Sequence, residues 1–392
     1  MQGRRVAVTG IGVVGPCGTG KESFFEGLCG EAPVGERRVH DFDPSQYFDN
    51  PKDARRADRF AQFAVAAAAE AMEQAGELTA DPARIGTFVG TGVGGIQTLE
   101  KQIAICLNKG ARRVSPFLVP MIMSNAAAAT LSMKYGFQGP CENTVTACAA
   151  GTHAIGNGAR LIASGRCDAV LAGGSEAPFT DTAVAGFANM TALSSDGISR
   201  PFDRDRHGFV MAEGGGILVL EEMETAIARG ATILGEILGS ASTADAHHIT
   251  APAPGGTGAI TCMRLAIDDA GLQPSDIVHV NAHGTSTGKN DEAESHAMME
   301  VFGAPGPAVT STKGVTGHAL GGAGALEAAA VLLAMSKKLI PPTWGYTTPD
   351  PELPEIDIVA GDPRPWQPGP SMSNSFGFGG HNGSVIIGPP PS

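Results

Sequence analysis

Short apolar runs rich in β-branched residues alternate along the chain with longer stretches of alanine and other small residues. The stretch Arg59–Gly76 ends at a glycine and Glu327–Lys338 carries lysines in its last turn, which are typical ends of helices. Strands separated by helices form βαβ units packed in layers, so the pattern predicts an α/β fold. The apolar runs predict strands at Val6–Val8, Thr87–Val89, Thr144–Thr146, Ala169–Ala172, Ile217–Leu220, Ile277–Asn281, Ala308–Thr312, Ile356–Ala360 and Val385–Ile387.

Two strand-to-helix junctions each present a reactive side chain. The first leads into Cys148 and a helix of small residues, Ala149–Ser164, and the second leads through His318 into a similar helix, Ala319–Met335. This parallel suggests two related halves that face one site. We place the boundary after Glu222–Gly230, where a helix is expected to end, so that the halves are 1–232 and 233–392. Because no low-complexity linker separates them, one compact unit is expected.

Glycine accounts for 54 of the 392 residues, roughly twice its ordinary share of about 7%. No G-x-y period and no long Gly/Ser tract occurs, which excludes a collagen-like or linker protein. The glycines are therefore expected to serve tight turns and close packing.

The net charge of −13 disfavours a general nucleic-acid surface. An acidic partner would have to bind a local basic patch, and two clusters are candidates: Lys52, Arg55 and Arg56, and Lys109, Arg112 and Arg113. In isolation such a cluster would be interpreted as a solvated helical face.

A cytoplasmic protein is expected. The apolar run after Arg4 and Arg5 is short and interrupted by glycines, so it does not form a secretory segment. No apolar run is expected to approach the roughly 18 residues that a membrane-spanning helix needs. Seven cysteines, an odd number without a paired framework, suit a reducing compartment.

The segment Gly10–Gly15 matches the G-x-G-x-x-G dinucleotide pattern after a predicted strand. Pro16 follows directly, and no strand ending in an acidic residue appears about 20 residues further on. An overlapping match to the phosphate-binding pattern G-x-x-x-x-G-K has Glu22 where Ser or Thr would hold magnesium. A nucleotide site is disfavoured, and a tight glycine turn after an edge strand is the alternative.

Cys148 lies where a β-branched strand ends and a helix of alanine and glycine begins. Amides at a helix N-terminus stabilise a thiolate, so this position predicts a lowered cysteine pKa and a nucleophilic thiol. Small neighbouring residues would let backbone amides approach the sulfur, as an oxyanion hole requires. For the other six cysteines an inert role is expected.

Two histidine-containing segments follow in the second half. His283 ends a strand and precedes Gly284 and three hydroxyl residues; His279 shares its strand parity, so a metal pair is conceivable, although hydroxyls suit a polar ligand better. In the second segment His318 lies between Lys313 and Glu327, which could form an ion pair. Taken singly, each histidine is more often structural than catalytic.

Near the C-terminus, Ser373–Ser384 places Phe376 and Phe378 between glycines. The segment is expected to form either a mobile or tightly turned loop with amides pointing inward, or a glycine-rich hairpin between the last strands.

Four motifs of this chain, taken in order, resemble the motif set of elongating β-ketoacyl-acyl carrier protein synthases. They are Thr-Ala-Cys148, Asn-Ala-His283-Gly-Thr-Ser-Thr, Ser-Thr-Lys313 with Thr-Gly-His318, and Asn-Ser-Phe-Gly-Phe378-Gly-Gly. The resemblance extends over essentially the whole chain. It implies a thiolase-like fold, with two βα halves stacked in five layers (αβαβα), a dimer, and an active site between the halves.

The resemblance implies a decarboxylative Claisen condensation of an acyl-enzyme with malonyl-acyl carrier protein. Cys148 would accept the acyl group, and His283 and His318 would donate hydrogen bonds to the malonyl thioester. The amides of Cys148 and Phe378 would form the oxyanion hole, while Lys313, paired with Glu327, would set local charge and histidine orientation.

Further residues are assigned only by the resemblance. Thr285 and Thr287 match positions that bind the phosphopantetheine arm, Phe376 and Phe378 the gating loop, and Leu99, Leu118 and Val119 the acyl channel. The partner would be an acyl carrier protein, acidic in this family, and Lys52, Arg55 and Arg56 would dock it. No metal or cofactor is expected, because loss of carbon dioxide drives the condensation and the substrates are carried on 4'-phosphopantetheine.

Two other functions remain open. One is a non-elongating decarboxylase or acyltransferase of the same fold. The other is a subunit of a heterodimeric secondary-metabolite system, either catalytic or only a scaffold. The subunits that set chain length in such systems usually lack the nucleophilic cysteine, so the presence of Cys148 argues against that role. A homodimer is expected, with a heterodimer as the alternative. Acyl chain length and pathway are not predicted.

Overall fold

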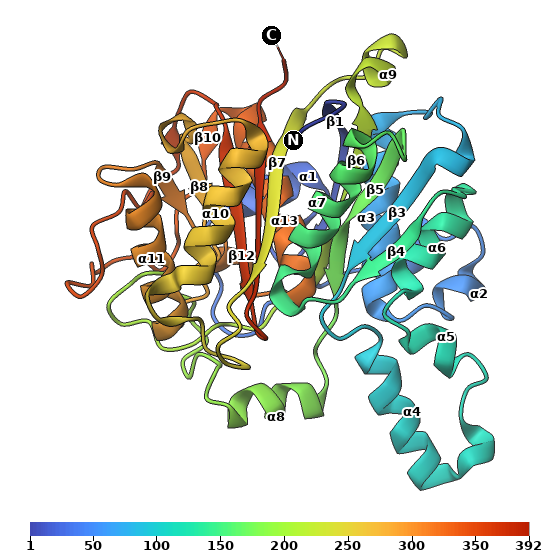
Figure 1. The fold of residues 1–392 in the computed structure, drawn as a ribbon. Helices are drawn as coiled ribbons and strands as arrows, with labels where there is room; N and C mark the ends of the chain where they lie inside the picture. The colour runs from blue at the N-terminus through green and yellow to red at the C-terminus, as the bar shows by residue number, and fades with distance from the viewer. Residues whose placement is uncertain (392) are drawn as a thin grey trace.

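The computed structural model describes residues 1–391, and a large mixed β-sheet runs through its centre (Figure 1). Within these residues the 11-stranded sheet has the order β4-β3-β5-β6-β1-β7-β13-β12-β8-β9, with β2 paired to β1. Its strands are β1 Val6–Gly15, β2 Gly18–Thr19, β3 Ile85–Gly90, β4 Cys141–Thr144, β5 Ala169–Glu176, β6 Gly214–Glu222, β7 Gly235–Ala244, β8 His279–Asn281, β9 Ala308–Thr310, β12 Ser371–Gly377 and β13 His381–Gly388; β10 Leu339–Ile340 pairs separately with β11 Arg364–Pro365.

The helices lie in three layers around the two parts of this sheet. Helices α7 (Ala150–Ala163) and α13 (Ala323–Lys337) contact both parts, whereas α3 (Arg59–Ala75) covers the outer face of β1, β5 and β6, and α10 (Thr257–Ala270) covers β7 and β13 (Figure 1). This arrangement confirms the predicted five-layered α/β fold. The other α-helices are α1 Lys21–Cys29, α2 Pro51–Ala54, α4 Ile96–Lys109, α5 Leu118–Ile122, α6 Ala126–Tyr135, α8 Asp181–Asn189, α9 Met223–Ala228, α11 Gly288–Phe302 and α12 Lys313–Thr316.

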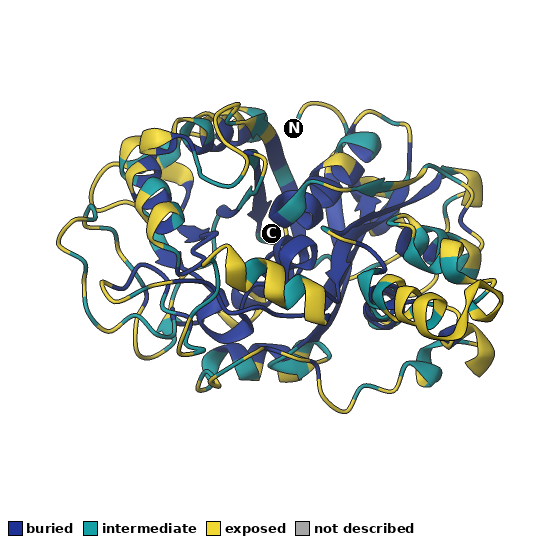
Figure 2. Cartoon of the chain, turned by 90° about the horizontal axis from the view of Figure 1, so that it is seen from below, coloured by how far each residue is buried: buried dark blue, intermediate teal, exposed yellow. Residues whose placement is uncertain are grey.

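The central strands and the two middle helices are buried, while peripheral helices such as α4 and α8 carry exposed faces (Figure 2). Alanine dominates the buried face of α3 and is the commonest residue of α13, so helices and sheets can approach closely. The layers therefore bring the ends of α7 and α13 together at the middle of the molecule.

The segment Gly10–Gly15 belongs to β1, in the interior of the sheet. The predicted glycine turn is therefore wrong, and the segment forms no phosphate-binding loop. A Cβ added at Gly10 would lie 2.1 Å from the carbonyl oxygen of Ala71, and one at Gly12 would lie 1.8 Å from that of Ala67. These glycines let α3 pack directly on the strand.

Two other predictions from the sequence fail. The predicted strand Ile356–Ala360 makes only an isolated bridge between Ile358 and Val309, and the strand expected at Thr144–Thr146 ends at Thr144. No apolar run long enough to span a membrane was expected, but the stretch Leu320–Lys337 is long and apolar enough by length and composition. It forms the core helix α13 with its preceding turn and is mostly buried inside the protein. Its alanine, leucine, valine and methionine side chains explain both properties.

The two halves are continuous in the sheet. Val6 and Val8 of β1 pair with Ile237 and Gly235 of β7, and the chain passes from one part to the other between α9 and β7. The boundary at 232 falls in this connection and stays a prediction.

Candidate active site

Cys148 lies in a sharp turn between β4 and α7. The short 3₁₀ turn Ala147–Ala149 leads into the helix, and Ala147 has a φ of 50°. A positive φ at a residue other than glycine costs about 1–3 kcal/mol and persists where surrounding contacts hold it. The turn places Cys148 against the glycine-rich hairpin, where a Cβ on Gly377 would lie 3.0 Å from the Cys148 amide nitrogen.

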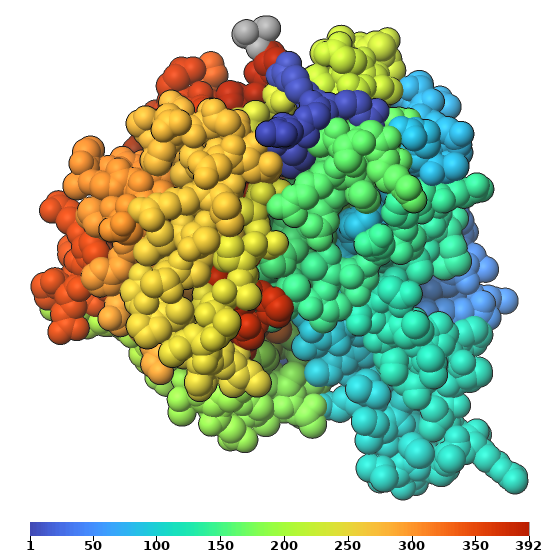
Figure 3. All heavy atoms as spheres, viewed as in Figure 1, coloured from blue at the N-terminus to red at the C-terminus, as the bar shows by residue number. Residues whose placement is uncertain are grey.

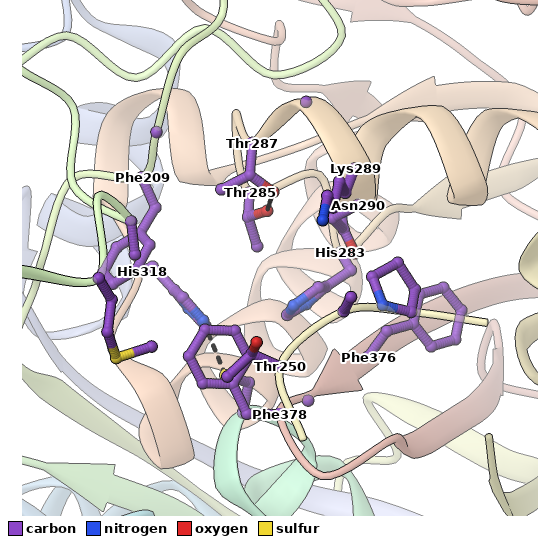
Figure 4. A pocket seen from close by; sticks show the side chains of 18 of the residues that line it. Phe209, Thr250, His283, Thr285, Thr287, Lys289, Asn290, His318, Phe376 and Phe378 are labelled. Atoms are coloured by element: carbon purple, nitrogen blue, oxygen red, sulfur yellow. Dashed lines mark hydrogen bonds between the residues drawn. The ribbon is translucent and has the colours of Figure 1, made fainter. Parts of the chain in front are cut away.

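His283 and His318, from the second half of the chain, point into one cavity (Figure 4). Cys148 lines the same cavity. His283 follows β8, and His318 follows α12. The Nε2 atom of His318 lies 3.0 Å from Cys148 Sγ, and the two imidazole rings are nearly perpendicular with centroids 5.3 Å apart. Residues that are 135 or more positions from Cys148 in the sequence thus share one buried site.

Lys313 and Glu327 form a buried ion pair behind the histidines. Lys313 Nζ also lies 3.4 Å from His283 Nδ1. An ammonium group only donates, so Nδ1 accepts and His283 carries its proton on Nε2. His283 therefore presents an N–H donor to the cavity.

Both histidines are held neutral. Burial, followed by the positive charge of Lys313, keeps the pKa values of His283 and His318 well below the usual value of 6.5. Neutral imidazoles can donate hydrogen bonds without the cost of a buried charge.

The expected lowering of the Cys148 pKa is wrong. Burial raises the pKa of Cys148 to about 11, and the opposing effects of the Phe378 backbone N–H and the positive charge of Lys313 are smaller. Removal from water disfavours the thiolate more than the nearby amide and charge favour it. Cys148 is therefore a neutral thiol at neutral pH.

The three residues open onto a cavity of about 500 Å³ (Figure 4). Thr285 and Thr287 line it with their hydroxyl oxygens 2.9 Å apart, and Phe376 and Phe378 line another part of its wall. The glycine-rich segment is the tip of the β12–β13 hairpin, with positive φ values at Gly379 and Gly380. The hairpin and the inward-pointing amide were predicted as alternatives. The structure has both, because the hairpin tip directs the Phe378 backbone N–H towards Cys148.

Other candidate residues lie outside this cavity. Leu99 is on α4 and Leu118 and Val119 are on α5, and none of them lines it. Lys52, Arg55 and Arg56 are exposed on and just after α2, where the Arg56 guanidinium lies over the Phe117 ring. Within a single chain, neither the channel candidates on α4 and α5 nor the docking candidates near α2 lie beside Cys148. Their roles therefore stay proposals.

The conceivable His279–His283 metal pair does not form. His279 is buried beside Trp366, and burial lowers its pKa to about 3. Cys148, His283 and His318 could themselves hold a metal ion, because one donor atom from each lies within 4.8 Å of the others. A site without metal remains a prediction.

Three residues of the site were missed. Glu294 accepts hydrogen bonds of 2.7 Å from the backbone N–H groups of both His283 and Gly284, and Glu176 accepts one of 3.0 Å from Gly321 in the turn before α13. The Phe209 ring packs edge-on against His318. Glu294 could have been found from the sequence, because it is an acidic residue on the buried face of helix α11. No local sequence feature indicated Glu176 or Phe209.

Known proteins are similar to this chain in sequence and architecture. Family models for the "Beta-ketoacyl synthase, N-terminal domain" and "Beta-ketoacyl synthase, C-terminal domain" match residues 30–226 and 234–347. A 3-oxoacyl-[acyl-carrier-protein] synthase 2 of Synechocystis sp. is 45% identical over 97% of both chains. The structure of the ishigamide ketosynthase/chain length factor is 34% identical, covers 99% of this chain and 100% of its own, and has a TM-score of 0.94.

A second solved structure is a type II polyketide ketosynthase bound to the hexaketide, in complex with its acyl-carrier protein. It is 32% identical, covers 99% of this chain and 100% of its own, and has a TM-score of 0.91.

Proposed function

The chain belongs to the β-ketoacyl synthase family, and on this premise we propose that Cys148, His283 and His318 carry out its reaction. That reaction is the decarboxylative condensation of an acyl-enzyme thioester with malonyl-acyl carrier protein, which gives 3-oxoacyl-acyl carrier protein. The 3.0 Å contact between His318 Nε2 and Cys148 Sγ, beside His283 in one cavity, is the observation that carries the assignment.

In the first half-reaction Cys148 sulfur attacks the acyl thioester of the carrier. The new bond joins this sulfur to the acyl carbon, the carrier's carbon–sulfur bond breaks, and the thiol proton passes to the departing carrier thiolate. His318 Nε2 is the nearest group that can relay this proton. The amides of Cys148 and Phe378 would stabilise the tetrahedral oxyanion.

In the second half-reaction malonyl-carrier loses carbon dioxide. The electron pair of the broken carbon–carbon bond forms an enolate. The enolate carbon bonds to the acyl carbon, whose bond to Cys148 sulfur breaks, and the released thiolate takes up one proton from solvent. Neutral donors at His283 and His318 would stabilise the enolate oxygen as its charge develops. Lys313, held by Glu327, would keep His283 in the tautomer with Nε2 protonated.

The cavity wall is assigned to substrate. Thr285 and Thr287 would hydrogen-bond the 4'-phosphopantetheine arm, and Phe376 and Phe378 would gate the acyl chain. Leu99, Leu118 and Val119 would line the acyl channel once the molecule is assembled. The protein would need no separate cofactor, and a cytoplasmic location is consistent with seven free cysteines.

A mass-spectrometric experiment tests the function. The protein is mixed with a panel of acyl-carriers, and intact mass is measured before and after malonyl-carrier is added. We expect an acyl adduct on Cys148 that disappears as 3-oxoacyl-carrier forms. Acetyl-carrier without chain extension would identify a non-elongating decarboxylase or acyltransferase, and absence of any adduct across the panel would reject the mechanism.

We further propose that a second copy of the chain completes the molecule. Strand β4 is the edge of the sheet, and Cys141 and Glu142 on it are exposed. The arm formed by α4 and α5 projects from the body (Figure 1, Figure 3) and exposes Ile103, Leu107 and Val119. An open edge beside an apolar surface favours association between subunits. A chain-length-factor partner, which two related structures name, is the alternative occupant.

We expect Lys52, Arg55 and Arg56 to dock the carrier protein. Reversing Arg55 and Arg56 to Glu should raise KM for the carrier-bound substrate by about tenfold or more, because like charges would then meet across the interface. KM for a small pantetheine thioester should not change, and steady-state kinetics with both substrates measures this.

Arg166→Glu provides the matched control, since Arg166 is exposed beyond the end of α7 opposite to Cys148. Equal KM changes for the two substrates in the Arg55/Arg56 variant would reject the docking role.

A further inference from the structure

His153 is a buried histidine close to the nucleophile that the mechanism does not use. It lies on α7, five positions after Cys148, and is 9% exposed. It does not line the cavity. Its Nδ1 lies 2.8 Å from Thr146 Oγ1, and its Nε2 lies 3.0 Å from the carbonyl oxygen of Asn382. Both ring nitrogens therefore have partners.

These partners determine the protonation of the ring. A carbonyl oxygen only accepts, so Nε2 must carry the proton and donate it to Asn382. Nδ1 is then the acceptor, and the Thr146 hydroxyl donates to it. Burial lowers the pKa of His153 and favours this neutral form. One ring thus accepts from Thr146 and donates to Asn382.

The two contacts join different parts of the site. Thr146 directly precedes Ala147, whose φ of 50° forms the turn that presents Cys148. Asn382 belongs to β13, on the far side of the hairpin tip that carries Phe378. The side-chain amide of Asn382 donates to Asp245 at 2.7 Å, so its own position is also held. His153 therefore connects the nucleophile turn to the strand behind the proposed oxyanion hole.

We infer that His153 is a positioning residue for Cys148: through Thr146 and Asn382 it holds the strained turn at Ala147 against the β12–β13 hairpin. The inference rests on the proposed function. Without these bonds the turn can relax, and Cys148 Sγ shifts relative to His318 and the Phe378 amide. Displacements of about 1 Å in a reacting group can reduce rates by about 10²-fold.

A double-mutant cycle tests this role, with Thr146→Val and His153→Leu measured alone and together. The readouts are the single-turnover rate of acyl transfer onto Cys148, the KM for acyl-carrier and the melting temperature. We expect each single variant to lose about 10- to 100-fold in acyl-transfer rate with little change in KM. The double variant should be no slower than the slower single variant, because both substitutions remove the same link.

Thr146→Ser keeps the hydroxyl and should restore most of the rate. Thr87→Val is the matched control, since the buried hydroxyl of Thr87 on β3 has no partner among the described residues; this variant should acylate as the unmodified protein does. A Thr146→Val protein with the unmodified rate, losses that multiply in the double variant, or a lower melting temperature with an unchanged rate would each overturn the inference. Failure of the unmodified protein to acylate would instead reject the proposed function.

Discussion

Replacing Cys148 by alanine is expected to lower condensation by more than about a thousandfold, since loss of a covalent nucleophile removes the acyl-enzyme route itself. The variant should show no acyl adduct by intact mass with any acyl-carrier. Decarboxylation of malonyl-carrier should persist, because His283 and His318 remain in place. The measurements are 3-oxoacyl-carrier formation, adduct mass and carbon dioxide release.

The control for this variant is Cys106→Ala, which removes an exposed thiol on α4 and should leave all three measurements unchanged. Comparable melting temperatures would show that both variants fold. An acyl adduct retained in the Cys148→Ala protein would place the nucleophile elsewhere and contradict the assignment.

Replacing His283 by alanine should separate the two half-reactions. Acyl transfer onto Cys148 should stay within about tenfold of normal, whereas condensation should fall by about 10²- to 10³-fold, the effect of removing one donor to a developing oxyanion. Single-turnover adduct formation measures the first step, and product formation from the preformed acyl-enzyme measures the second. His296→Ala, on the exposed face of α11, is the control.

The same histidines predict a pH profile. Burial and Lys313 hold the pKa values of His283 and His318 well below 6.5. Both imidazoles are therefore neutral above pH 6.5 and also slightly below it. The rate of malonyl-carrier decarboxylation should therefore be flat from about pH 6 to pH 8 instead of falling as pH decreases through the ordinary histidine pKa of about 6.5. An inflection near pH 6.5 would show that a charged imidazole forms in this range.

Much of the fold could be predicted from local pattern. Alternating strand and helix runs predicted the α/β class, and the stop signals located the ends of α3 at Gly76 and of α13 near Lys338. Residues Gly10–Gly15 were misassigned because glycine favours turns locally, whereas here it removes side chains from the path of α3. Close packing between distant segments has no local signature.

The candidate site divides in the same way. The spacing around Cys148 and Lys313 predicted a junction with a reactive group and the pairing of Lys313 with Glu327, which the structure contains. The Cys148 pKa was predicted in the wrong direction, because its helix position was known from sequence but its burial was not. Glu294 and Phe209 were missed because they reach the histidines only through tertiary contacts.

The sequence by itself determined which chemical groups this protein has, their order and the family to which it belongs, because those properties are carried by residue identity and local spacing. Only the tertiary structure decided that His318 lies 3.0 Å from Cys148, that the thiol and imidazoles are neutral, and that His153 ties the nucleophile turn to β13. Each of these depends on burial and on distances between segments far apart in the chain, which arise only when the layers pack.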